Sequence, residues 1–237
     1  VIKPYEGTRL GRQEIEGEIL DDVPGALWQR AVLERQRIRE ITITLKRIVV
    51  AIDPSISAGE DSHECGMVVA GLGSNDQGYL LEDLSERMPS SEWGARAVAA
   101  YHRHEADCIV AEVNNGGDLV ETQIKVEDKT VPVKQVRATR GKAVRAEPIG
   151  RLYEQGQIWH LGAFPALEDQ MCAFLPLSPD DEPNDRVDAD VWAFTDLMLT
   201  NRVPGISHVY SQIEGGDRDP STLRDPWWDK DEMDGPS

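Results

Sequence analysis

The chain has 237 residues, 40% of them apolar, which is enough to bury the core of one domain. It carries 25 basic against 43 acidic residues, a net charge of −18, and on average this argues against a polyanionic partner such as nucleic acid. No apolar run approaches the roughly 18 residues of a membrane span, and an odd set of cysteines without metal-ligand spacing fits a reducing compartment, so we expect a soluble intracellular protein.

The first 40 or so residues are polar with scattered apolar positions. Apolar side chains at 26–28 and 31–33 predict one short amphipathic helix there. The start without Met indicates a piece of a longer chain.

From Ile41 onward, alternating and apolar runs predict four strands, at 41–45, 48–52, 66–72 and 78–85. Turn residues at Gly59 and at 74–78 separate them, as consecutive antiparallel strands require. We therefore expect an antiparallel meander.

The second half alternates helical and strand patterns. Helices are predicted at 90–104, 117–125, 141–155, 167–174 and 186–199, with strands at 107–113, 131–136 and 158–161. The order predicts a mixed α/β architecture. Residues 203–237 are rich in Pro, Gly and Asp, which predicts an acidic, mobile tail.

Acidic residues end or open three of these elements. Asp53 closes an apolar run before Pro54, Glu112 lies near the end of a second run, and Asp185 and Asp188 open the last helix on one face. Carboxylates on separate core elements predict one oxygen-lined divalent-metal site. Each acid also has a plainer interpretation, as a turn, a solvated strand end or a helix cap. Asp190 projects about 200° round the helix from Asp188 and is the poorer candidate.

One basic cluster interrupts the acidic chain. Between residues 134 and 151 the sequence holds six basic residues against Glu147 alone, among them Arg137, Arg140, Lys142 and Arg145. This cluster could contact a DNA backbone, or it could be a solvated helix face.

The order of these motifs resembles a known family. The segments are Gly7-Thr8-Arg9-Leu10-Gly11, Asp53-Pro54, Glu112-Val113-Asn114-Asn115-Gly116-Gly117, Arg140-Gly141-Lys142 and Asp185-Arg186-Val187-Asp188. Together they resemble the nuclease domain of a tailed-phage or phage-like large terminase subunit, in the ribonuclease H-like superfamily. The resemblance implies a ribonuclease H-like mixed sheet, an antiparallel meander plus parallel strands, flanked by helices.

The resemblance also implies a domain organisation. Residues 1–40 would be a linker or the end of a missing ATPase domain, residues 41–202 the nuclease domain, and 203–237 the tail. No Gly-x-x-x-x-Gly-Lys-Ser/Thr loop occurs in the sequence, so the motor half is not in this chain.

The implied function is metal-dependent DNA endonuclease activity that cuts concatemeric viral DNA during genome packaging. Asp53, Glu112 and Asp188, with Asp185 as a fourth candidate, would be catalytic and would hold two Mg²⁺ or Mn²⁺ ions, the arrangement that phosphodiester hydrolysis uses. Arg137, Arg140, Lys142 and Arg145 would bind DNA. Implied partners are double-stranded DNA, the ATPase domain of the full-length chain, the small terminase and the portal, in the cytoplasm of the host cell, with no membrane.

Three alternatives remain open from the sequence. A Holliday-junction resolvase shares the acidic layout and differs in substrate. A restriction-type nuclease is disfavoured because its acid-x-Lys signature is absent, since Val113 and Asn114 follow Glu112. The chain could instead be a catalytically idle docking module of a packaging complex, and metal-dependent cleavage separates that alternative from the others.

Overall fold

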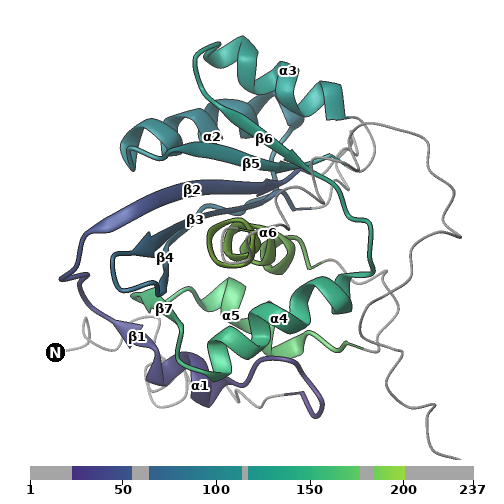
Figure 1. Cartoon of the computed structure of the whole chain (residues 1–237). Coiled ribbons are helices and arrows are strands. Elements are labelled where there is room, and N and C mark those ends of the chain that lie inside the picture. The colour runs from purple at the N-terminus through teal and green to yellow at the C-terminus, as the bar shows by residue number, and fades with distance from the viewer. Residues whose placement is uncertain (1–22, 55–63, 114–116, 177–183, 201–237) are drawn as a thin grey trace, which may run out of the picture. The chain divides into compact units, whose positions relative to one another are not determined.

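The fold is a mixed sheet with helices on both faces, seen in a computed structural model that describes residues 23–54, 64–113, 117–176 and 184–200 (Figure 1). Within these residues the sheet has seven strands in the order β1-β7-β4-β3-β2-β5-β6. Their bounds are β1 Arg37–Ile38, β2 Leu45–Asp53, β3 Gly66–Gly73, β4 Gly78–Asp83, β5 Cys108–Glu112, β6 Val133–Val136 and β7 Ile158–Leu161. The helices are α1 Arg30–Arg35, α2 Ser90–Arg103, α3 Gly117–Glu127, α4 Lys142–Glu154, α5 Pro165–Ala173, α6 Asp185–Phe194 and the π-helical turn η3 Thr195–Leu199.

The pairing combines two kinds of strand. β2, β3 and β4 form an antiparallel meander, while β5 and β6 extend the sheet in parallel from β2. On the other side β7 and β1 also join in parallel. The predicted mixed sheet, an antiparallel meander plus parallel strands, is confirmed.

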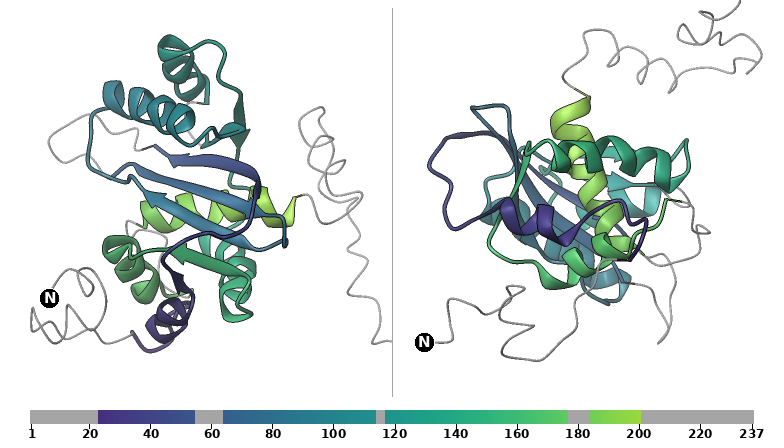
Figure 2. Two further views of the ribbon diagram at one scale, coloured as in Figure 1. Left: turned by 90° about the vertical axis from the view of Figure 1, so that its left-hand side faces the viewer. Right: turned by 90° about the horizontal axis from the view of Figure 1, so that it is seen from below.

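Alternation along the central strands creates two cores. Val49 and Ala51 of β2 pack into the core that α1, α4, α5 and α6 cover, whereas Val50 and Ile52 pack into the core under α2 and α3. Because successive strand residues point to opposite faces, a continuous apolar run marks a strand covered on both sides. The two helical layers lie on opposite sides of the sheet in Figure 2.

Two predicted elements differ from the structure by more than small shifts of their bounds. The separate strand at 41–45 is wrong, because β2 begins at Leu45 and pairs there with Gly73, the last residue of β3, so residues 41–44 have no ladder partner. The predicted helix at 186–199 starts at Asp185 and changes to the wider η3 turn at Thr195. Sequence periodicity does not separate an α-helix from a π-helical extension of the same apolar face.

Residues before 41 contribute to the same core as the sheet. Trp28 is 2% exposed and Leu33 fully buried, and β1 pairs in parallel with β7. The boundary at residue 40 stays a prediction, and the predicted tail at 203–237 lies outside the described residues. In the described parts of the chain, no helix has the length and apolar character needed to cross a membrane.

Candidate metal centre and nucleic-acid interface

A cavity of about 300 Å³ opens where β2 and β5 end. Its lining combines acidic and basic side chains with two small residues: Asp53, Glu112, Ala138, Arg140, Gly141, Lys142, Arg145 and Asp188. Three of the four acids that the sequence singled out therefore line one cavity, together with three of the four predicted DNA-binding residues.

Strand register explains why two of the acids meet. β2 and β5 run in parallel, with Ile52 opposite Ala111, so the next residues, Asp53 and Glu112, come to the same edge of the sheet. Asp188 reaches that edge from the first turn of α6, which packs against β2 and β3. The acids therefore converge because strand and helix ends meet there.

Two cations of α4 pair with the buried acids. Lys142 Nζ lies 2.9 Å from Asp188 Oδ2, and Arg145 Nη2 lies 3.2 Å from Asp188 Oδ1. Arg145 Nη1 is also 3.6 Å from Glu112 Oε2. Since Glu112 is 7% and Asp188 4% exposed, these pairs offset the cost of burying two carboxylates.

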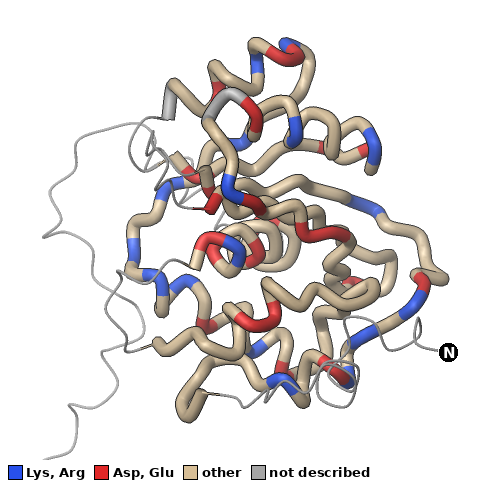
Figure 3. The backbone as a smooth tube through the Cα atoms, turned by 180° about the vertical axis from the view of Figure 1, so that it is seen from behind, with Lys and Arg blue, Asp and Glu red and all other residues tan. Residues whose placement is uncertain are grey.

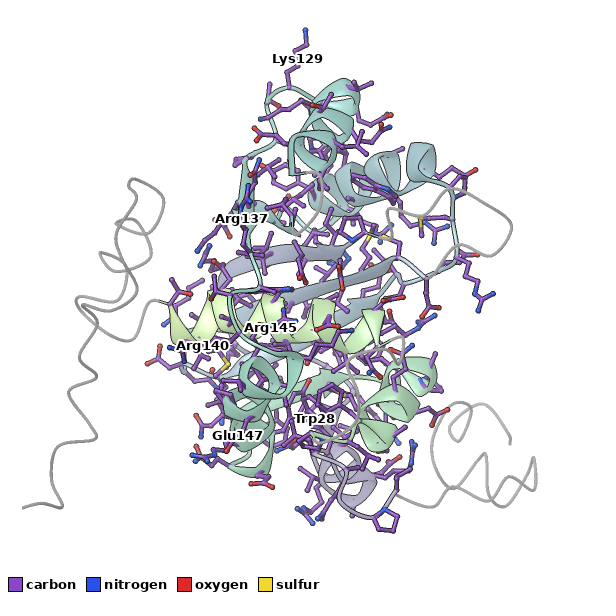
Figure 4. The ribbon with its side chains drawn as sticks, turned by 90° about the vertical axis from the view of Figure 1, so that its right-hand side faces the viewer. Trp28, Lys129, Arg137, Arg140, Arg145 and Glu147 are labelled. Carbon is purple, nitrogen blue, oxygen red and sulfur yellow. The ribbon has the colours of Figure 1, made fainter. Side chains whose placement is uncertain are left out.

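Two further cations lie on the segment that joins β6 to α4. Arg137 and Arg140 are exposed, and among the described residues neither makes a hydrogen bond or ion pair. Figure 4 places both along this connection and Arg145 facing α6, and Figure 3 shows basic positions following one another from β6 into α4. Cations without an acidic partner beside a cavity are available to an anionic ligand.

The charges in the cavity perturb one another. Burial raises the pKa of Asp53 well above its ordinary value, and the neighbouring charges of Glu112, Asp188 and Asp185 raise it further, against a smaller opposing effect of Lys142. For Lys142, burial works to lower the pKa, but the nearby carboxylates, Asp188 above all, prevail, so the pKa is raised. The carboxylates around Asp53 therefore disfavour its charged form.

The donor set suits a hard divalent cation, which prefers carboxylate and water oxygen. Yet across the described ranges no group of three or more His, Cys, Asp or Glu side chains is already gathered tightly enough to hold an ion. Lys142 and Arg145 contact the carboxylates instead. Ion binding at Asp53, Glu112 and Asp188 would require Glu112 and Asp188 to exchange their cationic partners, a rearrangement of side chains within one cavity.

Asp185 occupies a different place from the other three acids. It is the first residue of α6 and does not line the cavity, although its charge contributes to the raised pKa of Asp53. The structure thus brings Asp185 near the cluster but puts Asp188 inside it.

Sequence reasoning missed Trp192, which lies one helical turn after Asp188. Its indole Nε1 donates a hydrogen bond to Glu112 Oε2, and the guanidinium carbon of Arg145 lies 4.8 Å from the centre of its ring. The i, i+4 spacing from Asp188 placed both side chains on one face of the helix and was the available signal.

A second group that sequence reasoning missed lies on the opposite side of α6. Asp190 is fully buried and accepts a hydrogen bond from Tyr153 OH at 3.1 Å. The Tyr153 oxygen is 3.1 Å from His160 Nε2, and His160 Nδ1 is 3.1 Å from Glu168 Oε1. Burial raises the pKa of Asp190 to about 8. Sequence reasoning considered Asp190 only as the poorer candidate for a metal ligand. Because Asp190 is turned away from Asp188 around the helix axis, its side chain enters this hydrogen-bond network instead.

Comparison with known proteins identifies the fold. The family described as "Terminase RNaseH-like domain" matches residues 50–197, which contain all four acids and all four predicted DNA-binding residues. No curated protein matches the chain significantly.

Solved structures agree. The nuclease domain of the large terminase subunit of bacterial virus Sf6 superposes with a TM-score of 0.53 at 10% identity, over 70% of this chain and 96% of that one. A mutant of that domain with manganese and beta-thujaplicinol gives 0.51 at 9% identity, over 70% and 96%. The large terminase nuclease from thermophilic phage G20c with bound magnesium gives 0.50 at 15% identity, over 73% and 98%. The predicted ribonuclease H-like fold is confirmed.

Proposed function

The chain belongs to the family of terminase ribonuclease H-like domains, and we therefore propose that it is a divalent-metal-dependent endonuclease that cuts double-stranded DNA during viral genome packaging. One observation carries the proposal most: Asp53, Glu112 and Asp188 line a single cavity whose remaining charged side chains, among the residues that the structure describes, are all cationic. Acids alone would repel a phosphodiester, and cations alone would hold it without hydrolysing it.

Asp53, Glu112 and Asp188 would hold two Mg²⁺ or Mn²⁺ ions, with Asp185 as a further candidate ligand. Bound ions of this kind activate a water molecule and neutralise charge on the attacking and leaving oxygens. Related nuclease structures that contain magnesium or manganese support the choice of ion.

The basic side chains would place the DNA. Arg137 and Arg140 are exposed on the connection into α4 and would contact the DNA backbone, Arg140 from the lining of the cavity. Lys142 and Arg145, which also line the cavity, would face the phosphate at the cut position once the acids have exchanged partners. Because the chain carries a net charge of −18, this local cluster opposes a long-range repulsion. An attached ATPase motor would offset that repulsion by raising the effective concentration of DNA.

The packaging role extends the proposal beyond the nuclease chemistry. The natural substrate would be concatemeric viral DNA in the host cytoplasm, and the partners would be the ATPase domain of the full-length chain, the small terminase and the portal. Family membership supports this context.

The test is cleavage of supercoiled plasmid by the purified chain with Mn²⁺, with Mg²⁺ and in excess chelator. We expect nicked and linear products only with a divalent ion. Equal cleavage in chelator would refute metal dependence, and no cleavage under any condition would favour a docking module. A four-way DNA junction is the second substrate, and strong preference for it over linear duplex would favour a resolvase.

A further inference from the structure

Arg186 lies between the two acids Asp185 and Asp188, yet its side chain takes no part in the cavity. We propose that Arg186, together with Glu64 and Asp83, is a positioning clamp that holds the first turn of α6 where Asp188 can share an ion with Asp53. This inference rests on the proposed function of the same site.

The contacts of Arg186 are many and convergent. Its Nε donates to Glu64 Oε2 at 2.8 Å, its Nη2 pairs with Glu64 Oε1, and its Nη1 donates to Asp83 Oδ2 at 2.6 Å. The side chain of Arg186 is 14% exposed and that of Asp83 6%. A planar guanidinium that engages two carboxylates fixes direction as well as distance, which a lysine ammonium does not.

The N-terminus of α6 is capped by a side chain from outside the helix. Asn184 precedes α6 and forms no side-chain cap, but the backbone N–H of Arg186 donates to Gln170 Oε1 at 3.2 Å. Gln170 Nε2 in turn donates to Glu64 Oε2 at 3.2 Å. Gln170 of α5 therefore accepts a hydrogen bond from a backbone N–H in the first turn of α6. Glu64 contacts both Gln170 and the side chain of Arg186.

Gly66 sets how closely the clamped turn approaches the sheet. Gly66 is the ladder partner of Asp53, and a Cβ at this position would lie 1.8 Å from the carbonyl oxygen of Asp185. Only glycine permits that approach. The clamp therefore holds the turn of Asp185 and Asp188 directly beside the strand pair that presents Asp53.

A clamp of this kind should act on metal affinity more than on the fold. Groups that orient metal ligands typically change affinity by 10–100-fold when removed. A purely structural ion pair of similar burial would lower stability without that selective effect. Arg47 offers the matched case, since it pairs with buried Asp196 at 2.7 Å, at the opposite end of the continuous α6–η3 segment.

The experiment compares Arg186→Lys and Asp83→Asn with the control Arg47→Gln. Each purified chain is titrated with Mn²⁺ by calorimetry, and its thermal unfolding is measured without metal. We expect Mn²⁺ affinity to fall on the order of tenfold in Arg186→Lys, less in Asp83→Asn, and to stay within about twofold of wild type in Arg47→Gln. Because Asp83→Asn is isosteric, it still tests the clamp if Arg186→Lys unfolds.

Two outcomes would overturn the clamp: unchanged Mn²⁺ affinity in both Arg186→Lys and Asp83→Asn, or an equal reduction in Arg47→Gln. Absence of Mn²⁺ binding by the wild-type chain would be a different result, because it would overturn the proposed function and the clamp with it.

Discussion

Asp188 and Asp190 are two buried carboxylates only two residues apart, and they lie in different surroundings on either side of α6. Asp188 faces the cavity and pairs with Lys142 and Arg145. Asp190 faces the core, where Tyr153 donates a hydrogen bond to it. One carboxylate is met by cations beside open space, and the other by a neutral hydroxyl in a closed interior.

Both carboxylates are buried, so burial alone does not separate the proposed ligand site from a structural contact, whereas their partners do. A carboxylate that pairs with cations, as Asp188 does with Lys142 and Arg145, can exchange one cation for another. Burial raises the pKa of Asp190 to about 8, with the hydrogen bond from Tyr153 opposing the shift and the negative charge of Asp83 adding to it. A run such as Asp-Arg-Val-Asp-Ala-Asp therefore places its carboxylates in two different environments.

Removing the acids of the cavity should have the strongest effect on cleavage. Asp53→Asn and Asp188→Asn should each reduce metal-dependent plasmid cleavage by at least about 100-fold, because each removes a proposed metal ligand and a charge. Asp190→Asn should stay within about threefold of wild type. We expect Asp185→Asn to be less impaired than Asp188→Asn, since Asp185 does not line the cavity.

Initial rates at saturating Mn²⁺, with circular dichroism to verify folding, measure these effects. The distinction between the two sides of α6 would fail if Asp190→Asn were as inactive as Asp188→Asn while remaining folded. A greater reduction in Asp185→Asn than in Asp188→Asn would instead mean that the main ligand is misassigned.

Trp192→Phe should give the next strongest reduction in cleavage. Phenylalanine keeps an aromatic face for Arg145 but has no N–H for Glu112. We expect cleavage to fall by about tenfold with a higher Mn²⁺ requirement, both measured from initial rates across a Mn²⁺ series.

Trp159→Phe is the matched control for Trp192, because the buried Nε1 of Trp159 has no hydrogen-bond partner among the described residues. It should cleave at the wild-type rate. Equal reductions in both variants would mean that the ring, and not the hydrogen bond to Glu112, is what matters.

A weaker effect is expected from Arg137 and Arg140, which form no ion pair with any residue that the structure describes. The double variant Arg137→Ala/Arg140→Ala should bind duplex DNA less tightly, and the slope of log affinity against log salt should decrease by about one for every phosphate that the variant no longer touches. Arg151→Ala is the control, since Arg151 is an exposed α4 cation that already pairs with Glu147. Fluorescence anisotropy across a salt series measures the slopes, and identical slopes in wild type and both variants would remove the segment between β6 and α4 from the interface.

The weakest expected effect is that of Asp190→Asn on how the stability of the fold depends on pH. Because the pKa of Asp190 is about 8 in the folded chain and near 4 when unfolded, the unfolded state releases this proton first as pH rises. The folded state is therefore progressively disfavoured from about pH 4 to pH 8, and Asp190→Asn abolishes that effect. We expect the melting temperature of Asp190→Asn relative to wild type to increase by about 3 °C or more between pH 5 and pH 8. A pH-independent difference would contradict a protonated Asp190.

The sequence predicted the parts of the site that depend on local patterns. Continuous apolar runs identified β2 and β5, and their parallel register brought Asp53 and Glu112 to one edge. The strand predicted at 41–45 does not form, because a strand needs a neighbouring strand to pair with and the neighbour, β3, ends at Gly73. Local alternation carries no information about the length of the neighbouring strand.

The rest of the site depends on tertiary packing. Nothing in the local pattern pairs Arg145 with Trp192, since the packing of α4 on α6 brings them together. The basic cluster was visible as composition. Its division into ion-paired side chains, Lys142 and Arg145, and side chains on the preceding segment that have no ion pair in the described ranges required the fold. Likewise Asp190 was set apart by helical geometry, while its partner Tyr153 comes from a different helix.

Calorimetric titration of Mn²⁺ into the wild-type chain, Asp188→Asn and Asp190→Asn at one pH tests the metal site most directly. We predict that wild type and Asp190→Asn bind about two ions and that Asp188→Asn fails to bind at least one of them. Wild-type binding by Asp188→Asn, or defective binding in Asp190→Asn alone, would contradict the assignment of the metal site to the cavity side of α6.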